Sequence, residues 1–276
     1  MARELPPILT AENSRLILGG AALVSLDLGL SESRVELQGE VVLLPTGDKV
    51  SIEDLRRIAG KEDAAFFPDS GRLYQVAISD EHYYKLVPTS GAPTLEIDGI
   101  RMHRTKDTTP DRDASGKLEA LGGSAGRVLD TCAGLGYTGG AALDRGAEAV
   151  VSVEVSAQVL RIAQMNPWSR SLFDDGVSLI LGDSYGVLDA LPKGFFDYVI
   201  HDPPRLSLAG SLYGEGFYRK LFRVTAQGGR LFHYVGEPGS RHRGIDLQRG
   251  VTRRLGAVGF RKIMYHDDVM GLTCEK

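Results

Sequence analysis

Four acidic residues stand where apolar stretches of the sequence end, and each could hold a polar ligand. These acids are Asp130, Glu154, Asp183 and Asp202, and the stretches are 127–129, 149–153, 177–181 and 196–200. Carboxylates accept hydrogen bonds from hydroxyl and amino groups and attract cations. If the stretches are neighbouring parallel strands, the acids meet at one edge of a sheet.

A glycine-rich turn follows the first acid. The segment Gly134-Leu135-Gly136-Tyr137-Thr138-Gly139 matches the dinucleotide pattern G-x-G-x-x-G, and Glu154 follows about 20 residues later, where an acid would hold a ribose. A nicotinamide or flavin enzyme is therefore one interpretation. Asp130 argues against it, because an acid beside an anionic diphosphate is unfavourable. The same acid favours a cationic or zwitterionic ligand.

The fourth strand end reads His201-Asp202-Pro203-Pro204-Arg205. Proline has no N–H, so this loop is stiff and offers carbonyl oxygens and one carboxylate. Such a loop suits a reacting amine or hydroxyl group that donates hydrogen bonds to these oxygens. Asp202 and Pro203 are our candidates for the acceptor site. His201 is a candidate general base, and packing within the sheet is the alternative.

Further candidates for substrate contact lie on several segments: Arg205, Tyr213, His233, Arg241 and His103. The histidine at 233 and the tyrosine could equally be core residues. Arg241 belongs to a basic loop at 239–244, which is either solvated or binds an anion. His103 lies in a polar segment without periodicity that leads into the next helix.

Strand and helix patterns alternate from residue 126 onward, as expected for βαβ units. The pattern predicts an α/β fold, a doubly wound and mostly parallel seven-stranded sheet, over 115–276. Expected strands are 127–129, 149–153, 177–181, 196–200, 230–235, 262–265 and 270–274, and expected helices are 115–121, 138–146, 156–165, 185–191, 214–224 and 250–258.

Residues 1–100 predict a small β-rich domain, and 101–114 a linker that could line the cofactor pocket. A helix is expected near 11–18, a strand over 34–44, a helix over 53–59 and a hairpin turn at 68–71. This domain is expected to serve packing or homodimerisation, or to grip a substrate.

Composition excludes several classes of protein. The 276 residues carry a net charge of −4, which argues against a surface coated in positive charge for nucleic acid. Two cysteines make no disulfide framework, and no Cys/His cluster has zinc spacing, so no metal is expected. Neither a signal peptide nor a transmembrane run is visible, so we expect a cytoplasmic protein.

Taken together, these motifs resemble the class I S-adenosylmethionine-dependent methyltransferases. Those that carry the resemblance are Leu129-Asp130, Gly134 with Gly136, Glu154, Gly182-Asp183 and Asp202-Pro203-Pro204. The resemblance implies a Rossmann-like fold and S-adenosylmethionine as cofactor. It implies that Asp130 and the turn of Ala133, Gly134 and Gly136 hold the methionine part. Glu154 would then take the ribose, Asp183 the adenine amine, and Ser184 would flank the adenine.

A narrower resemblance covers nearly the whole chain. The strings Met102-His103-Arg104, Asp130–Thr138, Asn166-Pro167-Trp168-Ser169, His201–Arg205 and Phe232–Gly236 are similar to a family of predicted archaeal methyltransferases. Asp-Pro-Pro also resembles the motif of methyltransferases that act on amine nitrogens of bases, where an aromatic residue usually follows. Here that residue is Arg205, a departure from the motif, and a guanidinium plane can also stack on a base. Asp-Pro-Pro-Arg also resembles the carbon-5 uridine methyltransferases, which need a cysteine nucleophile after this motif. Only Cys274 follows, inside the expected last strand, which argues against that family.

The sequence therefore predicts a methyltransferase acting on an amine nitrogen, in RNA or in a small amine. An aminopropyltransferase on the same fold is the first alternative. It would want extra acids for a polycationic amine, and acids around the fourth strand are few. A non-catalytic cofactor-binding or RNA-binding module is the second alternative, and a nicotinamide enzyme the third.

Overall fold

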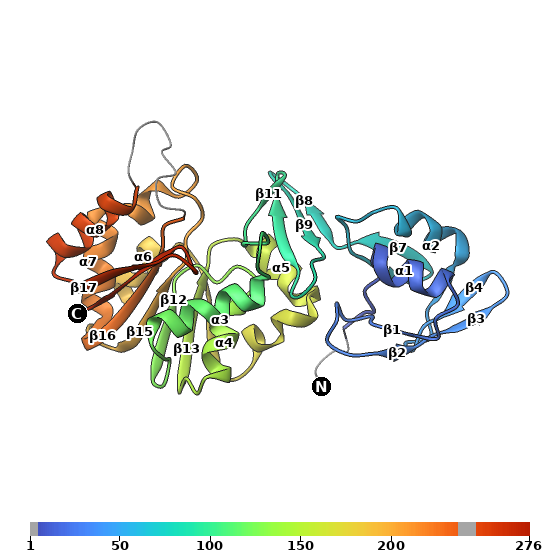
Figure 1. Cartoon of the computed structure of the whole chain (residues 1–276), viewed down its shortest axis with the longest axis horizontal. Helices are drawn as coiled ribbons and strands as arrows, with labels where there is room; N and C mark the ends of the chain where they lie inside the picture. Colours follow the sequence, from blue (N-terminus) through green and yellow to red (C-terminus); the bar gives the residue numbers. More distant parts are fainter. Residues whose placement is uncertain (1–4, 237–246) are drawn as a thin grey trace. The chain divides into compact units, whose positions relative to one another are not determined.

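A computed structural model describes residues 5–236 and 247–276, and the chain divides into two compact units (Figure 1). Unit 1 is formed by Met1–Pro110 with Gln158–Arg170, and unit 2 by Asp111–Ala157 with Ser171–Lys276.

Unit 2 is built on a seven-stranded sheet with the order β14-β13-β12-β15-β16-β18-β17. Its strands are β12 (Arg127–Asp130), β13 (Ala149–Glu154), β14 (Val177–Leu181), β15 (Phe196–His201), β16 (Thr225–Tyr234), β17 (Arg261–His266) and β18 (Gly271–Glu275). The first five run parallel and β18 is antiparallel to both neighbours. The strand order reverses direction at β12, where ligands bind in sheets of this kind. The predicted fold class is confirmed.

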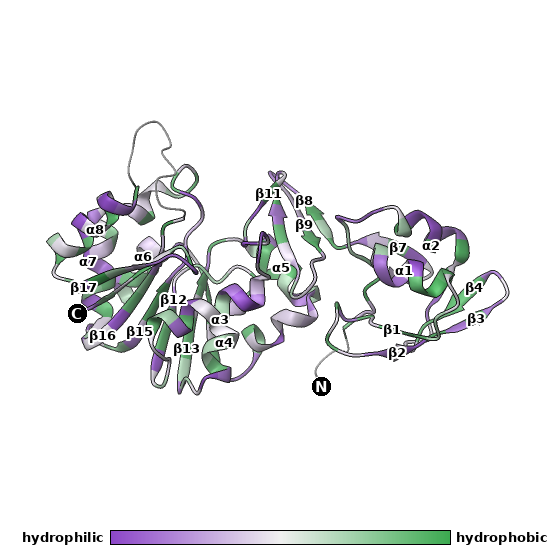
Figure 2. Cartoon of the chain, viewed as in Figure 1, coloured by the Kyte–Doolittle hydropathy of each residue, from purple (hydrophilic) through white to green (hydrophobic). Residues whose placement is uncertain are grey.

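Helices cover both faces of this sheet. Neighbouring residues of each strand point to opposite sides, so each central strand contributes to two hydrophobic cores. Leu129, Val199 and Leu231 belong to a core that includes residues of α6, α7 and α8. Val128, Ile200 and Phe232 belong to a second core with residues of α3 and α4. The central strands read as apolar runs for this reason, and Figure 2 colours much of their length green.

The α-helices lie near their predicted positions, and two 3₁₀ helices, at 167–173 and 210–213, were not predicted. The helices are α3 (Pro110–Leu121), α4 (Tyr137–Asp144), α5 (Ala157–Met165), η1 (Pro167–Phe173), α6 (Ser184–Ala190), η2 (Gly210–Tyr213), α7 (Glu215–Val224) and α8 (Leu247–Val258). The predicted start of α3 at Ser115 is wrong by one turn and more. Proline at the first position of a helix costs no hydrogen bond, so Pro110 begins the helix instead of ending the linker.

Unit 1 is β-rich, as predicted. Its elements are α1 (Ala11–Leu18), β1 (Leu23–Val24), β2 (Ser33–Arg34), β3 (Glu36–Gln38), β4 (Val41–Leu43), β5 (Lys49–Ser51), α2 (Ile52–Ala59), β6 (Phe66–Asp69), β7 (Arg72–Gln75), β8 (Ala77–Ser79), β9 (Tyr83–Val87), β10 (Thr94–Ile97) and β11 (Ile100–Arg101). The strands form small sheets, of which the largest has the order β11-β10-β9-β8. A core that includes Leu9, Val42 and Leu55 lies beneath α1 and α2.

The single strand expected over 34–44 is wrong. The chain turns back between Gln38 and Val41, and β3 pairs with β4 as a hairpin. Gly39 takes a φ of 63°, which glycine adopts without strain. The alternation of apolar residues continues through the turn, and this misled the prediction.

Within the described residues, no helix is long and apolar enough to cross a membrane. The same residues contain no group of three or more His, Cys, Asp or Glu side chains that could hold a metal ion.

Candidate active site

Asp130 ends the central strand β12 and is completely buried. Its carboxylate accepts a hydrogen bond from the Thr138 hydroxyl and a longer one, 3.3 Å, from the Cys132 N–H. Burial raises the pKa of Asp130 to about 6, and the negative charges of Asp202 and Glu154 add to this effect. No cation of the described chain forms an ion pair with this carboxylate, so its charge is uncompensated.

Glu154 ends the neighbouring strand β13 and faces the glycine turn. Its two oxygens accept the N–H groups of Gly134 at 2.8 Å and Ser156 at 2.9 Å. Burial raises the pKa of Glu154 although these hydrogen bonds lower it. The side chain thus ties the turn to the end of β13, and a carboxylate oxygen can still accept a second hydrogen bond.

The glycine turn has a left-handed backbone at two positions, which glycine adopts without strain. Gly134 and Gly136 have φ values of 55° and 81°, and Gly136 is the N-cap of α4. A Cβ on Gly136 would lie 2.7 Å from Cβ of Leu172. Both the positive φ at this position and the close packing of Leu172 therefore favour glycine over any residue with a side chain.

Gly136→Ala is expected to lower the free energy of unfolding by about 3 kcal/mol, from left-handed strain and the contact with Leu172. The matched control is Gly146→Ala, since Gly146 also has a positive φ, 88°, but no atom within 4 Å of an added Cβ. The control should lose only the strain, about 1 kcal/mol. Urea unfolding measures both, and equal losses would contradict the packing role of Gly136.

Asp183 and Ser184 lie at the end of β14 and play different structural roles. Asp183 is exposed and caps α6, accepting the Tyr185 N–H at 3.0 Å. Ser184 is buried, and its hydroxyl donates to the carbonyl of Thr131. Ala133 is buried too, and its N–H donates to the Val153 carbonyl at 2.9 Å. Ser184 and Ala133 therefore lie next to the turn, at the ends of β12 and β13.

Asp202, directly after β15, forms an ion pair that the sequence analysis did not identify. Its Oδ2 lies 2.5 Å from Nζ of Lys117, which also contacts Asp113 at 2.6 Å. Lys117 is 6% exposed and Asp113 4%. The two carboxylates raise the pKa of Lys117 above its ordinary value, although burial opposes them. The cluster of Asp113, Lys117 and Asp202 carries one net negative charge when all three groups are ionised.

His201 lies in the core beside this cluster and is completely buried. Its Nε2 is 3.0 Å from the Leu212 carbonyl oxygen and its Nδ1 is 2.7 Å from the Thr131 hydroxyl. A carbonyl only accepts, so Nε2 carries the proton and Nδ1 accepts from Thr131. Burial lowers the pKa of His201 to about 3. Both ring nitrogens are thus engaged, which leaves no lone pair for a substrate proton.

His233 is the register partner of His201 on β16, and it is also completely buried. The two ring centroids are 4.4 Å apart. The Nε2 atom of His233 lies 2.9 Å from the Tyr218 hydroxyl. Burial lowers the pKa of His233 well below its usual range. The structure thus places this residue in the core, which the sequence analysis kept open as the alternative to substrate contact.

Tyr213 and Arg205 lie on the chain that follows Asp202. Tyr213 is 3% exposed, and its hydroxyl donates to the Pro204 carbonyl at 3.0 Å. Burial and the charge of Asp202 raise the pKa of Tyr213. Arg205 is exposed and Pro203 is buried. Tyr213 therefore fixes the Asp-Pro-Pro loop from its far end.

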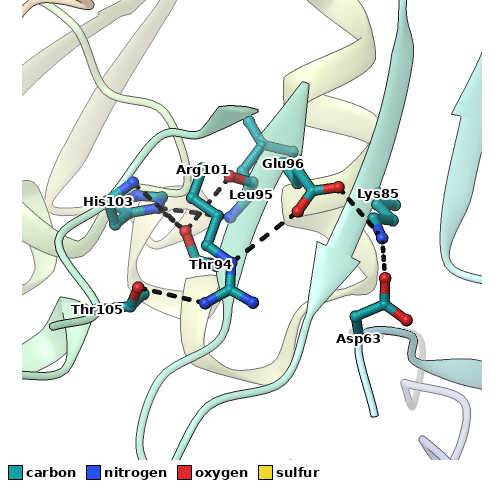
Figure 3. Close-up of polar contacts among 8 residues, drawn as sticks. All are labelled: Asp63, Lys85, Thr94, Leu95, Glu96, Arg101, His103 and Thr105. Carbon is teal, nitrogen blue, oxygen red and sulfur yellow. Dashed lines mark hydrogen bonds and ion pairs between the residues drawn. The ribbon is translucent and has the colours of Figure 1, made fainter. Parts of the chain in front are cut away.

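His103 belongs to unit 1, where it is part of a polar network around β9 to β11 (Figure 3). Its Nδ1 lies 3.1 Å from the Thr94 hydroxyl. On the same sheet, Lys85 joins Asp63 at 2.6 Å and Glu96 at 3.1 Å. These contacts fix the β-rich unit internally. The substrate candidate Arg241 lies outside the described residues, as does the rest of the basic loop at 239–244.

Comparison with known proteins gives a relative for the whole chain. The chain is 45% identical over 274 residues to the uncharacterized protein MJ1233 of Methanocaldococcus jannaschii, covering 98% of this chain and 92% of that one. It belongs to the same family. The family model described as conserved hypothetical protein 95 matches residues 115–208. The chain is also 32% identical over 152 residues to polyamine aminopropyltransferase 2 of Streptomyces coelicolor, covering 51% of this chain and 27% of that one.

Solved structures share the fold. A spermidine synthase in complex with the transition-state analogue AdoDATO has a TM-score of 0.59 at 19% identity, covering 72% of each chain. A putative S-adenosylmethionine-dependent methyltransferase from Streptococcus mutans has a TM-score of 0.50 at 13% identity. The match covers 74% of the present chain and 58% of the Streptococcus mutans chain. The fold is therefore that of the class I methyltransferases, which spermidine synthase shares.

Proposed function

We propose that unit 2 binds S-adenosylmethionine at the ends of β12, β13 and β14 and transfers its methyl group to an amine nitrogen held by Asp202 and Pro203. When bound, the donor supplies a methyl group on a positively charged sulfur. Asp130 with the turn of Ala133, Gly134 and Gly136 would hold the methionine part. Glu154 would hold the ribose, and Asp183 and Ser184 the adenine.

The observation that carries the proposal is the uncompensated charge of Asp130. Its carboxylate is completely buried, and Glu154 lies close enough to raise its pKa further. Burying an unpaired charge is costly unless a ligand compensates for it. A cationic ligand does so, whereas an anionic diphosphate would add to the repulsion. This electrostatic environment favours a sulfonium donor over a nicotinamide dinucleotide.

The acceptor would meet Asp202 at its second oxygen. Lys117 occupies Oδ2, and the side chain is 24% exposed. An amine that donates to Oδ1 and to the Pro203 carbonyl would be aimed by two fixed acceptors. Methyl transfer depends on such in-line positioning more than on proton transfer. His201, with both nitrogens engaged, would then support the loop and not remove a proton.

An aminopropyltransferase is the second candidate, favoured by the similarity to polyamine aminopropyltransferase 2 and by the shared fold of spermidine synthase. Such an enzyme uses a decarboxylated donor and needs free carboxylates for its polycationic acceptor. In this structure Lys117 already neutralises part of the charge of Asp202 and Asp113. We therefore place methyl transfer first.

Calorimetry with S-adenosylmethionine, decarboxylated S-adenosylmethionine and NAD tests the donor. We expect S-adenosylmethionine to bind most tightly. Transfer of a tritiated methyl group to RNA, protein and small-molecule fractions then identifies the acceptor class. Tighter binding of the decarboxylated donor would favour aminopropyl transfer, and binding of NAD alone would refute both proposals.

Asp202→Ala is expected to lower the rate of label transfer on the order of 100-fold, because the acceptor loses its alignment. Donor binding should persist and change far less than the transfer rate, since the donor residues lie on other strands and Asp202 acts on Asp130 only through its charge. Lys117 keeps Asp113 as its partner in this variant, so the protein should remain folded. Unchanged transfer would show that Asp202 does not hold the acceptor, as a non-catalytic module also predicts.

A further inference from the structure

A cavity of about 310 Å³ lies beside the Asp-Pro-Pro loop in unit 2. The chain after β15 contributes Leu206, Gly210 and Tyr213 to its wall. Helix α8 contributes Leu247, Gly250 and Arg254. The volume is in the range of small-ligand sites.

The topology places this cavity at the edge of the sheet where chemistry is expected. β15 and β16 are parallel neighbours, so the chain leaves both strands at the same edge. One wall of the cavity follows β15 and the other follows β16. Tyr213 connects the cavity to the acceptor loop, because its hydroxyl donates to the Pro204 carbonyl. The cavity therefore adjoins the site assigned to the acceptor.

The face of α8 that lines the cavity combines apolar surface, free space and one cation. Leu247, Gly250 and Arg254 are spaced i, i+3 and i+7, which puts them on one side of a helix. A Cβ on Gly250 would lie 3.3 Å from Nη1 of Arg254. The guanidinium of Arg254 therefore lies over Gly250, toward the start of α8. The absence of a side chain at Gly250 provides the space that it occupies.

Arg254 is not fully used by the surrounding protein. It hydrogen-bonds to the Tyr218 hydroxyl, which in turn contacts His233. Its Nε is buried and has no hydrogen-bond partner among residues 5–236 and 247–276. Burial lowers the pKa of His233 well below its usual range, and the charge of Arg254 adds to this effect. The side chain as a whole is only half-buried and lines the cavity, so the rest of its guanidinium can reach a ligand there. A guanidinium at the wall of a cavity favours an anionic ligand.

We propose that this cavity binds an anionic small-molecule group, a carboxylate or a phosphate, attached to an apolar or flat part. Arg254 binds the anion, and Leu206, Tyr213 and Leu247 contact the apolar part. That this ligand is the acceptor rests on the proposed function. The acceptor is then an amine that also carries an acidic group, and a polyamine is excluded because its cations would meet the guanidinium.

The test uses the full-length chain without donor and measures binding of benzoate, phenyl phosphate and benzylamine by saturation-transfer NMR and calorimetry. We expect at least one of the two anions to bind and benzylamine to bind at least 10-fold more weakly. The stronger of the two anions shows whether the ligand is a carboxylate or a phosphate. Equal or tighter binding of benzylamine, or no binding of either anion, would overturn the proposal.

Gly250→Leu fills the cavity and displaces the guanidinium, and should weaken anion binding at least 10-fold. Leucine is a better helix former than glycine by about 0.8 kcal/mol, so α8 should remain folded. Gly256→Leu is the matched control, because Gly256 lies on the same helix and an added Cβ would approach only Ile263, at 3.8 Å. It should bind as the unmodified chain does. If Gly250→Leu bound the anion as tightly as the unmodified chain, the anion would bind outside this cavity.

Arg254→Met and Arg254→Lys separate the charge from the shape of the cavity. The methionine variant should lose anion binding and the lysine variant should retain part of it.

The same measurements distinguish failure of the anion-site proposal from failure of the proposed function. If an anion binds but S-adenosylmethionine does not, the anion site is supported and methyl transfer is refuted. If S-adenosylmethionine binds and reacts but no anion binds, only the anion-site proposal is refuted.

Discussion

Lys117→Met is expected to abolish methyl transfer and to lower the free energy of unfolding by about 3–5 kcal/mol. Lys117 is the cation between Asp113 and Asp202, and it is 6% exposed. Methionine removes the positive charge and keeps much of the volume. The buried Asp113 then loses its ion pair with Lys117, and the charge of Lys117 no longer separates it from Asp202. Urea unfolding measures the stability, and tritiated methyl transfer the activity.

Two further variants make this result interpretable. Lys262→Met breaks the exposed pair between Lys262 and Glu275, in which the lysine side chain is 76% exposed. It should cost no more than about 1 kcal/mol. The double variant Asp113→Asn with Lys117→Met removes one acid together with the cation, and should recover part of the stability but not the activity. A loss below about 1 kcal/mol in Lys117→Met would contradict the ion cluster.

Much of the fold could be predicted because it depends on local patterns. Apolar runs mark the strands, since both faces of the sheet are covered and each strand is buried on both sides. Gly136 and Asp130 could be found because a left-handed turn and an acid at a strand end leave a signature in the sequence. The hairpin at Gly39 was missed, because its alternation continues unbroken across the turn.

The parts of the site that were missed depend on distant segments. Lys117 and Asp202 are separated by 85 positions in the sequence. The spacing of Asp113 and Lys117 shows a helical pair, but such pairs usually lie on exposed faces. His201 resembled a general base because the register that pairs it with His233 cannot be read from either strand alone. Arg254 becomes notable only when the fold brings it to the same cavity as Leu206 and Tyr213.

Asp130→Asn is expected to stabilise the protein at neutral pH and to weaken donor binding. The folded pKa of Asp130 is about 6, and the ordinary value is 3.8. Between these pH values the folded chain binds more protons than the unfolded chain, so the free energy of unfolding falls as pH rises. The shift corresponds to about 3 kcal/mol, lost between about pH 4 and 6. Asparagine cannot ionise and avoids this loss.

The difference in unfolding free energy between the variant and the unmodified chain isolates this group, because the other titrating residues occur in both. We expect the difference to rise from near zero below pH 4 to about 3 kcal/mol above pH 6. Asparagine can still accept from the Cys132 N–H and donate to the Thr138 hydroxyl, so the local structure should survive.

Donor binding should change in the opposite direction. A positively charged donor stabilises the ionised form of Asp130, so its affinity for the unmodified chain should rise with pH through the same window. In Asp130→Asn the affinity should be at least roughly 10-fold lower at pH 7 and lack this rise, because the attraction between the charges is absent. A variant that gains stability and also keeps its affinity would show that the buried charge serves neither folding nor the donor. A variant that gains stability and loses affinity shows that the chain retains an unfavourable carboxylate because the cationic ligand requires it.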